Sequence, residues 1–593
     1  MGRPLFLVLT LLAGLAQRAT PATVLDVQCL SLVHVAESAP PDSIAVDVYI
    51  AGGGLGGCAA ALAACDAGLR VLLSEETRWL GGQATAEGVS ALDENYWVET
   101  SGATRSYQRF RALIRDHYRP LCRATPPPAR LNPGNCWASA LAFEPAVGVA
   151  ALDSLLAPHC ASGALSILRR WKPYRAEVAG ARVVAVDLVQ LDSAARCRVR
   201  SAYYLDATAL GDLLPLVGAH YTVGAESRNV TGEPSAPALA DSRCEAAFTY
   251  PFVVEARPGE SRPWPAPPDY ARVVADAGFD DPWPLPLGSA SGDAGPPTLH
   301  ATLPGAPGSL WTYRRLIDAT QFDPAAHACA LTLVNWPTMD YRGGGLLSAD
   351  PEQQLAALRE AKALSLAFFH WMQTAMPRAD GGVGHPELRL LIAAMGSDDG
   401  LALHPYVRES RRLAAWTTLR EQDVAKALLP GRRRGRFFRD AVAIGHYGLD
   451  LHPGPCAETI SSEATRPFQI PLVALVPERI ENLLAAGRCL GVTHITASCT
   501  RLHPIEWAIG EAAGAAAAEC VASDLAPRAL LADPAALLRM QRRLVSRGAP
   551  IVWYADLATD DPRFQEAQLA PFVGADGDSL LELSSNYDSE AWQ

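Results

Sequence analysis

The chain has 593 residues, of which 49% are hydrophobic and 19% charged, and its formal net charge is −12. This length exceeds what one hydrophobic core usually holds, and it predicts about two to four folded domains. The composition excludes a disordered chain, and the acidic balance argues against a nucleic-acid surface. We therefore expect a globular protein whose partner is a small molecule and not a nucleic acid.

The N-terminus carries an early positive charge at Arg3 and an apolar run from Leu5 to Leu15. This layout is typical of a secretory signal peptide, and the run is shorter than the roughly 20 apolar residues of a membrane-spanning helix. We expect residues 1–22 to be a signal peptide, the mature protein to be extracytoplasmic or secreted, and no stable membrane span. A hydrophobic tail that stays inside the cell is the alternative.

A nucleotide-binding pattern follows in the stretch that begins at Ala45. A short apolar run to Ile50 predicts a buried strand, and an alanine-rich run ending near Gly68 predicts a helix with a glycine at its C-terminus. Between them lie three glycines in GxGxxG spacing: Gly52, Gly54 and Gly57. A second buried strand is predicted from Val71 to Leu73. This strand, turn, helix and strand unit is typical of dinucleotide binding, because the helix N-terminus attracts a diphosphate.

Glu75 ends the second strand, 18 residues after Gly57. A carboxylate at this position accepts hydrogen bonds from ribose hydroxyls and repels a 2′-phosphate. The motif therefore predicts a dinucleotide, with NADP the least expected.

Further stretches carry a more specific resemblance. A second glycine pair, Gly81 and Gly82, lies in "TRWLGGQAT", and flavoproteins of the glutathione reductase type use such a pair to pass the chain beside the FAD phosphates. "YYLDATALGDLLPL" and "NLLAAGRCLGVTHITASCTRLHPIEWAIGEAAGAAAAECV" resemble two further cofactor segments, and "NWPTMDY", "YVRESRRL" and "AIGHYGLDLH" resemble segments of a substrate-side lobe. With these stretches the chain resembles the FAD-dependent oxidoreductase family whose flavin domain is related to that of the flavin-carrying subunit of heterodisulfide reductase.

The resemblance covers nearly the whole chain after the signal segment, and it implies an α/β fold. We expect a Rossmann-like FAD-binding domain of the glutathione reductase type with an inserted substrate lobe. The expected FAD-binding domain is discontinuous and takes residues 45–110, 165–225 and 470–525. The substrate or cap lobe takes residues 111–164 and 226–469, and residues 526–593 form a C-terminal extension. A meander of antiparallel strands is expected in the second FAD segment, where "RVVAVDLVQL" alternates most clearly.

The resemblance also implies further cofactor residues. A strand is expected to end in Ala486, Gly487 and Arg488, and a later helix to start near Pro504 with its N-terminus toward the flavin pyrimidine edge. The cofactor-binding residues expected in addition to the GxGxxG glycines and Glu75 are Gly81, Gly82, Thr85, Asp206, Ala207, Thr208, Gly487, Arg488 and Arg501.

Candidate catalytic residues come from the predicted substrate lobe and from the segment before the last helix. Arg408 and Arg411 in "RESRR", together with Arg412, could bind a carboxylate, a polyhydroxy substrate or the flavin anion, or could form an ion-pair network with Glu409. His446 with Tyr447 is the preferred general base, and the alternative is a structural histidine at a strand end. His494 is expected near the flavin, where a covalent bond to it is conceivable.

Cysteine and histidine spacing argues against a metal or cluster site. The 13 cysteines contain no CxxC pair, so the iron–sulfur clusters of heterodisulfide reductase are not expected. A metal site from His446, Asp450 and His452 lacks a fourth ligand, and we expect none. Cys58 and Cys65 are expected in the core. A disulfide between Cys122 and Cys136 is expected from their proximity in the sequence alone.

These features predict an FAD-dependent oxidoreductase that transfers hydride between a small polar substrate, sugar-like or acidic, and flavin N5. The electron acceptor is left open. One alternative is a flavin-dependent reductase of an unsaturated acid. Another is a secreted FAD-bearing protein that binds a ligand without turning it over.

Overall fold

The computed structural model describes residues 22–36, 43–279 and 310–573, except residues 348, 379, 453 and 457–460. The predicted signal peptide lies outside the described residues apart from Ala22, which begins the first strand. The expected export therefore stays a prediction. None of the helices within the described ranges combines the length and the apolar composition that crossing a bilayer needs.

The predicted nucleotide-binding unit is confirmed. Strand β3 (Ser43–Ala51) leads into helix α1 (Leu55–Asp66), and strand β4 (Val71–Glu75) follows. Gly68 lies just after the helix with a φ of +88°, a left-handed conformation that glycine adopts at low cost. Eleven of the twelve residues of α1 are buried, so its small side chains let the helix pack on all sides.

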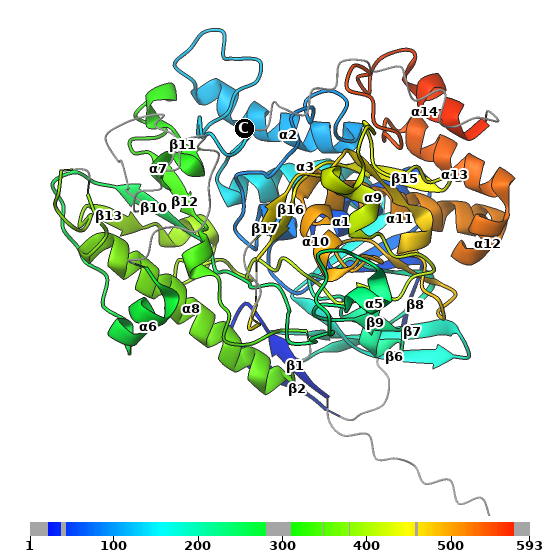
Figure 1. Cartoon of the computed structure of the whole chain (residues 1–593), viewed down its shortest axis with the longest axis horizontal. Coiled ribbons are helices and arrows are strands. Elements are labelled where there is room, and N and C mark those ends of the chain that lie inside the picture. Colours follow the sequence, from blue (N-terminus) through cyan, green and yellow to red (C-terminus); the bar gives the residue numbers. More distant parts are fainter. Residues whose placement is uncertain are drawn as a thin grey trace, which may run out of the picture.

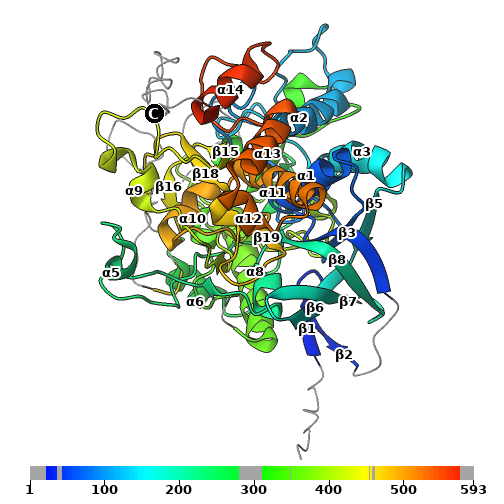
Figure 2. The same ribbon diagram turned by 90° about the vertical axis from the view of Figure 1, so that its right-hand side faces the viewer.

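A seven-stranded sheet forms the centre of the molecule, in the order β5-β4-β3-β8-β7-β6, with β19 pairing to β8. Its parallel strands are β3, β4, β5, β8 and β19, and the pairs β6–β7 and β7–β8 are antiparallel. The predicted meander is thus confirmed for β6, β7 and β8 at one edge of this sheet (Figure 2), whereas β5, from the same stretch, pairs parallel with β4 at the other edge. The strands not bounded above are β5 (Leu165–Arg169), β6 (Trp171–Ala179), β7 (Arg182–Gln190), β8 (Arg196–Asp206) and β19 (Leu483–Ala485).

Helix α11 (His503–Ser523) packs along α1, and the two helices lie side by side in the middle of the fold (Figure 1). Two glycines of α11 make this approach possible. A Cβ at Gly510 would lie 1.9 Å from the Gly56 carbonyl oxygen, and one at Gly514 would lie 2.4 Å from that of Ala60. A short helix that the sequence pattern did not predict, α10 (His494–Thr500), precedes α11.

A second lobe contains a four-stranded antiparallel sheet in the order β11-β12-β10-β13, with helix α8 beside it (Figure 1). Helix α8 (Pro351–Thr374) begins with a capping box between Asp350 and Gln353, which satisfies free N–H groups at its start. The strands of this sheet are β10 (Phe252–Ala256), β11 (Arg315–Ile317), β12 (Leu331–Val334) and β13 (Leu388–Leu390).

Smaller elements complete the fold. The hairpin of β1 (Ala22–Asp26) and β2 (Ser31–Val35) contacts α8, and α13 contacts both α11 and α14. The remaining helices are α2 (Arg105–Tyr118), α3 (Pro145–Ala161), α4 (Leu213–Leu216), α5 (Arg228–Thr231), α6 (Tyr270–Ala277), α7 (Leu310–Tyr313), α9 (Glu421–Val424), α12 (Pro527–Ala532), α13 (Pro534–Ser546) and α14 (Phe564–Val573). The remaining strands are β9 (Tyr221–Thr222), β14 (Arg412–Leu413), β15 (Ala441–Gly445), β16 (Leu449–Leu451), β17 (Ser461–Glu463) and β18 (Phe468–Pro471).

The mixed α/β architecture with a largely parallel sheet is therefore that of a Rossmann-type domain. The glutathione reductase subtype and the expected domain boundaries stay predictions.

Candidate functional site

A pocket of about 500 Å³ lies at the carboxyl ends of β3, β4 and β8, where ligands of open α/β sheets bind. Gly52 closes the turn after β3 with a φ of +93°. A Cβ there would lie 2.3 Å from the Ala207 carbonyl oxygen, so only glycine lets the two segments meet. Gly54, Gly82 and Thr208 also line the pocket, whereas Gly57 lies behind the turn, where a Cβ would meet the Gly52 carbonyl oxygen at 1.9 Å.

Glu75 lies where the motif predicts, at the end of β4 and in the pocket wall. The Gly53 N–H donates to its Oε2 at 2.7 Å, and the Thr77 N–H donates to its Oε1 at 2.8 Å. Burial raises the pKa of this carboxyl, with the nearby Glu76 adding to the effect. The Thr77 hydroxyl also donates to Oε1 at 2.8 Å, but Oε2 keeps a second lone pair, so Glu75 can still accept from a ribose hydroxyl.

The second glycine pair runs beside the first. The Gly81 N–H donates to the Gly53 carbonyl oxygen at 2.7 Å, and Gly82 faces the pocket. Thr85 does not: its hydroxyl donates to the Leu80 carbonyl oxygen, and it is absent from the described pocket lining. That Thr85 binds the cofactor stays a prediction.

Asp206 also turns away from the pocket. Its carboxylate accepts hydrogen bonds from the Thr208 N–H at 3.1 Å, the Thr208 hydroxyl at 2.7 Å and the Leu213 N–H at 2.9 Å. Asp206 therefore shapes the chain after β8, while its neighbours Ala207 and Thr208 line the pocket. Burial raises the pKa of Asp206 to about 7, against the opposing effect of these hydrogen bonds.

This pKa predicts a pH dependence of stability. Folded Asp206 keeps its proton up to pH about 7, whereas the unfolded chain releases it near its ordinary value of 3.8. Its contribution to stability is thus fully present below about pH 4 and is lost as the pH rises to about 7. We expect Asp206→Asn to remove this part of the slope, so that the melting temperature of the variant relative to the wild type rises by several degrees from pH 4 to pH 7. Thermal unfolding followed by circular dichroism measures it, and a constant difference would contradict the assignment.

The C-terminal segment closes the pocket with an ion triad. Gly487 follows β19, and the Arg488 guanidinium donates to the two oxygens of Glu87 at 2.9 and 2.6 Å, to Glu506 Oε2 at 3.2 Å and to the Val407 carbonyl oxygen. Burial alone lowers the pKa of Arg488, but the carboxylates of Glu87 and Glu506 raise it above its ordinary value. Arg488 therefore lies in the pocket wall as predicted, already neutralised by two carboxylates.

The opposite wall holds residues that the sequence analysis missed. Lys172 on β6 lies 2.7 Å from Glu76 and 3.6 Å from Asp212, and His404 Nε2 lies 3.6 Å from Glu76 Oε1. Burial alone raises the pKa of Glu76, but Lys172 and then His404 bring it well below its usual range. The lysine and the histidine come from segments with no nucleotide-binding signature. The pairing of β6 with the sheet could have indicated Lys172, whereas His404 lies outside the strands of the sheet.

The arginines of "RESRR" do not form one cluster. Arg408 binds Asp340 at 3.0 Å, and Arg411 binds Asp212 at 3.2 Å on the cofactor side. Arg412 pairs with Glu226 at 2.7 Å and with Glu409. The three guanidinium groups therefore serve separate ion pairs, and the ion-pair alternative with Glu409 holds for Arg412.

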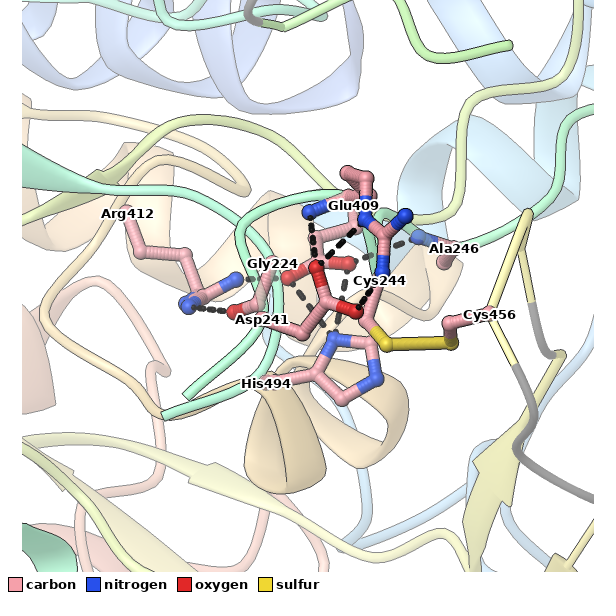
Figure 3. Close-up of a disulfide and its surroundings, with 9 residues drawn as sticks. Gly224, Asp241, Cys244, Ala246, Glu409, Arg412, Cys456 and His494 are labelled. Carbon is pink, nitrogen blue, oxygen red and sulfur yellow. Dashed lines mark hydrogen bonds and ion pairs between the residues drawn. A yellow bond between two sulfur atoms is a disulfide. The ribbon is translucent and has the colours of Figure 1, made fainter. Parts of the chain in front are cut away.

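His494 is paired with Glu409, the carboxylate that also binds Arg412. Its Nδ1 lies 2.9 Å from Glu409 Oε2, and the Ala246 N–H donates to the same oxygen at 2.8 Å (Figure 3). The disulfide between Cys244 and Cys456 lies beside this cluster.

The proposed pairing of Cys122 with Cys136 is wrong, because both are free thiols in the structure. The bonded cysteines, Cys244 and Cys456, are 212 residues apart in the chain, so proximity in sequence could not indicate them. Cys58 and Cys65 are buried in the core as expected.

A buried network extends from the cofactor pocket into the second lobe; we call it the substrate-side network and define it as Asp340, Tyr406, Arg408, Asp450, His452 and Arg501. The Gln83 amide donates to the Arg501 carbonyl oxygen at 2.8 Å, and the Arg501 guanidinium binds Asp450 at 2.9 Å and the Tyr406 hydroxyl. His452 lies between two carboxylates, 3.3 Å from Asp450 and 2.6 Å from Asp340. Burial alone raises the pKa of Asp450, but His452 and Arg501 hold it well below its usual range.

Of the two residues predicted together as the general base, Tyr447 contacts this network and His446 does not. The Tyr447 hydroxyl donates to Asp450 Oδ2 at 3.4 Å, and burial, followed by the charge of Asp450, raises its pKa well above the ordinary value. The His446 ring packs against Trp97 and Trp553, which also contact each other, and burial lowers its pKa to about 4. His446 is therefore a weak base at neutral pH. No three or more His, Cys, Asp or Glu side chains within the described ranges are arranged to hold a metal ion.

The pocket fits a dinucleotide. The glycine turn brings backbone N–H groups of α1 to the pocket, and Glu75 stands ready for a ribose. Among the described side chains, Gln83 Oε1 is a buried polar atom near the pocket without a hydrogen-bond partner, and His404 Nε2 has only the Glu76 carboxylate at 3.6 Å. Such atoms are costly unless a bound molecule completes them.

Comparison with known proteins gives the same cofactor. The model of the family described as FAD dependent oxidoreductase matches residues 47–544. No curated protein matches the chain. The solved structures similar to it include L-proline dehydrogenase from P. horikoshii, at 17% identity over 32% of this chain and 26% of that one, with a TM-score of 0.17.

Two further structures match over more of the chain. The myxobacterial chondrochloren halogenase CndH matches at 12% identity over 89% of each chain, and E. coli quinol fumarate reductase FrdA at 13% over 85% of this chain and 75% of that one, both with a TM-score of 0.30. The chain spans about a quarter of the length of the proline dehydrogenase. With TM-scores below 0.5, none of these similarities bears on its activity.

Proposed function

Since the chain belongs to the FAD-dependent oxidoreductase family and is an FAD-dependent enzyme, we propose that it oxidises a small polar substrate without a carboxylate beside the substrate-side network. Arg501 carries this proposal, because its carbonyl oxygen is bound to Gln83, which follows the second glycine pair, and its guanidinium to Asp450 and Tyr406. A substrate at this junction touches both the cofactor side and the second lobe. A relation of the flavin domain to that of heterodisulfide reductase belongs to the same proposal.

Gly52, Gly54 and Glu75 would hold FAD, whose flavin N5 would supply the hydride acceptor. The work left to the protein is to orient the substrate and to take its proton. Tyr447 can orient a hydroxyl or amine through its own hydroxyl group. The pKa of Asp450 is too low for a base, but Asp450 can accept a hydrogen bond from the substrate, and His452, whose Nδ1 lies 2.6 Å from Asp340, can take the proton. His452 and Arg501 hold the charge of Asp450, and a proton that reaches His452 can be shared with Asp340.

The pairing of the arginines favours this over the reduction of an unsaturated acid. A substrate carboxylate needs a cation that is not already neutralised. Arg408, Arg411 and Arg501 each bind an aspartate in the structure. The acidic substrate left open by the sequence is therefore the weaker candidate.

Asp450→Asn tests the proposal. We expect FAD to stay bound, while anaerobic bleaching of the flavin by the active members of a panel of sugars, polyols and amines slows by about a hundredfold or more, because the carboxylate that links the substrate to His452 is lost. Stopped-flow absorbance of the flavin bands measures the rate. Asp380→Asn, the same substitution at an exposed position, is the matched control and should bleach like the wild type. Equal rates in the Asp450 variant would remove this aspartate from the mechanism.

We also propose export. The Cys244–Cys456 disulfide supports it, because disulfides persist mainly in oxidising compartments.

A further inference from the structure

A glutamate in the first turn of α11 points back at the first turn of α1. Glu506 is only 3% exposed, and its Oε1 lies 3.5 Å from the Gly56 N–H. A Cβ at Gly54 would lie 3.1 Å from the same oxygen. The carboxylate therefore sits against the glycine turn and lines the pocket.

This position is the one a diphosphate needs. The N–H groups in the first turn of the helix after a GxGxxG motif donate to the diphosphate of a dinucleotide, and the positive end of the helix dipole adds to the attraction. A carboxylate oxygen accepts from the same donors and responds to the same field. Glu506 and the diphosphate of FAD thus compete for the same backbone N–H groups.

The charge of the pocket makes this overlap unfavourable for the cofactor. Five carboxylates line it against two permanent cations: Glu75, Glu76, Glu87, Asp212 and Glu506 against Lys172 and Arg488. Lys172 is paired with Glu76 and Asp212, and the terminal nitrogens of Arg488 donate hydrogen bonds to Glu87. What remains for Glu506 is the Arg488 Nε at 3.2 Å and the Gln83 amide.

We propose that Glu506 is a built-in competitor of the cofactor's diphosphate, which holds the affinity for FAD below what the glycine turn and Arg488 would give alone. The anion at the α1 N-terminus and the anion on the cofactor repel each other at close range. When Glu506 is neutral, both the helix N-terminus and the Nε of Arg488 are available to the diphosphate. The proposal rests on FAD binding alone and not on the substrate-side network.

Glu506→Gln tests it, because the amide keeps the shape of the side chain and removes its charge. The full-length protein, freed of FAD by dialysis, is titrated with FAD while the quenching of flavin fluorescence is followed. We expect the dissociation constant to fall by about tenfold, which corresponds to the upper range of a charge at a helix N-terminus. Glu511→Gln is the matched control on the same helix: Glu511 is 1% exposed and binds Ser106 and Arg547 away from the pocket. Its FAD affinity should not rise.

Competition with ADP and riboflavin assigns the gain to the diphosphate. ADP should displace FAD from the two proteins with an affinity that rises in the Glu506→Gln variant, whereas riboflavin, which lacks a diphosphate, should bind both alike. An unchanged or weaker affinity for FAD in the variant would overturn the proposal and assign Glu506 to holding Arg488 in place. An equal gain for riboflavin would overturn it too, because the effect would not come from the diphosphate.

Discussion

Gly52→Val is expected to abolish FAD binding. Valine would have to adopt a φ of +93°, which costs a non-glycine residue about 1–3 kcal/mol, and its Cβ would lie 2.3 Å from the Ala207 carbonyl oxygen and 2.5 Å from the Thr208 N–H. Because the overlap is with backbone, β8 and the glycine turn must move apart. A total cost of about 3 kcal/mol or more corresponds to a loss of affinity above about a hundredfold. The ratio of flavin to protein absorbance after gel filtration measures it.

Gly68→Ala is the control that distinguishes a clash at the pocket from the strain of a positive φ alone. Gly68 also has a positive φ, of +88°, yet a Cβ there would meet no atom within 4 Å. Alanine at this position should cost about 1 kcal/mol of stability and leave the flavin content unchanged. A colourless Gly68 variant would show that strain at either end of α1 is enough to release FAD.

Arg488→Met is expected to destabilise the folded protein strongly. Methionine fills much of the space but leaves Glu87 and Glu506 buried without their cation, at 2% and 3% exposure. Removing one partner of a buried ion pair costs about 3–5 kcal/mol. We expect a melting temperature lower by several degrees and a partial loss of FAD, measured by differential scanning fluorimetry and absorbance.

Two comparisons isolate the charge. Arg563→Met removes an arginine whose side chain is 76% exposed and paired with Asp561, and such surface pairs contribute little, so its melting temperature should hardly change. The double variant Arg488→Met with Glu87→Gln removes one stranded carboxylate and should recover part of the loss. If the double variant is no more stable than Arg488→Met, the cost lies in packing and not in unpaired charge.

Local features of the fold were predictable from the sequence. The glycine spacing, the apolar run before it and Glu75 after β4 are set by neighbours within one strand, turn, helix and strand unit, so their positions follow from the chain alone. The resemblance added Ala207, Gly487 and Arg488 from two distant stretches. Residues that reach the pocket only through the pairing of distant strands, such as Lys172 on β6, could not be predicted from local sequence.

The substrate side was harder to predict, because the type of a residue does not determine the direction in which its side chain points. Arg408, Arg411 and Arg412 are near neighbours in an extended segment, yet they reach Asp340, Asp212 and Glu226, which lie in three different parts of the chain. Similarly, His446 and Tyr447 are adjacent, but only the tyrosine reaches Asp450. Local sequence brought the right residue types together, and tertiary contacts decided which of them share a network.

The order of strands in the central sheet also bears on when the protein can fold. Strand β19 joins β8 from a position more than 270 residues later in the chain, and α11 follows it to cover α1. Contacts of such high sequence separation form late, because the loop between them must close first. During synthesis the glycine turn is therefore made early, but Arg488 and the first turn of α11 reach it only after more than 270 further residues have followed β8. Maturation with cofactor is thus coupled to synthesis of the segment that carries β19 and α11.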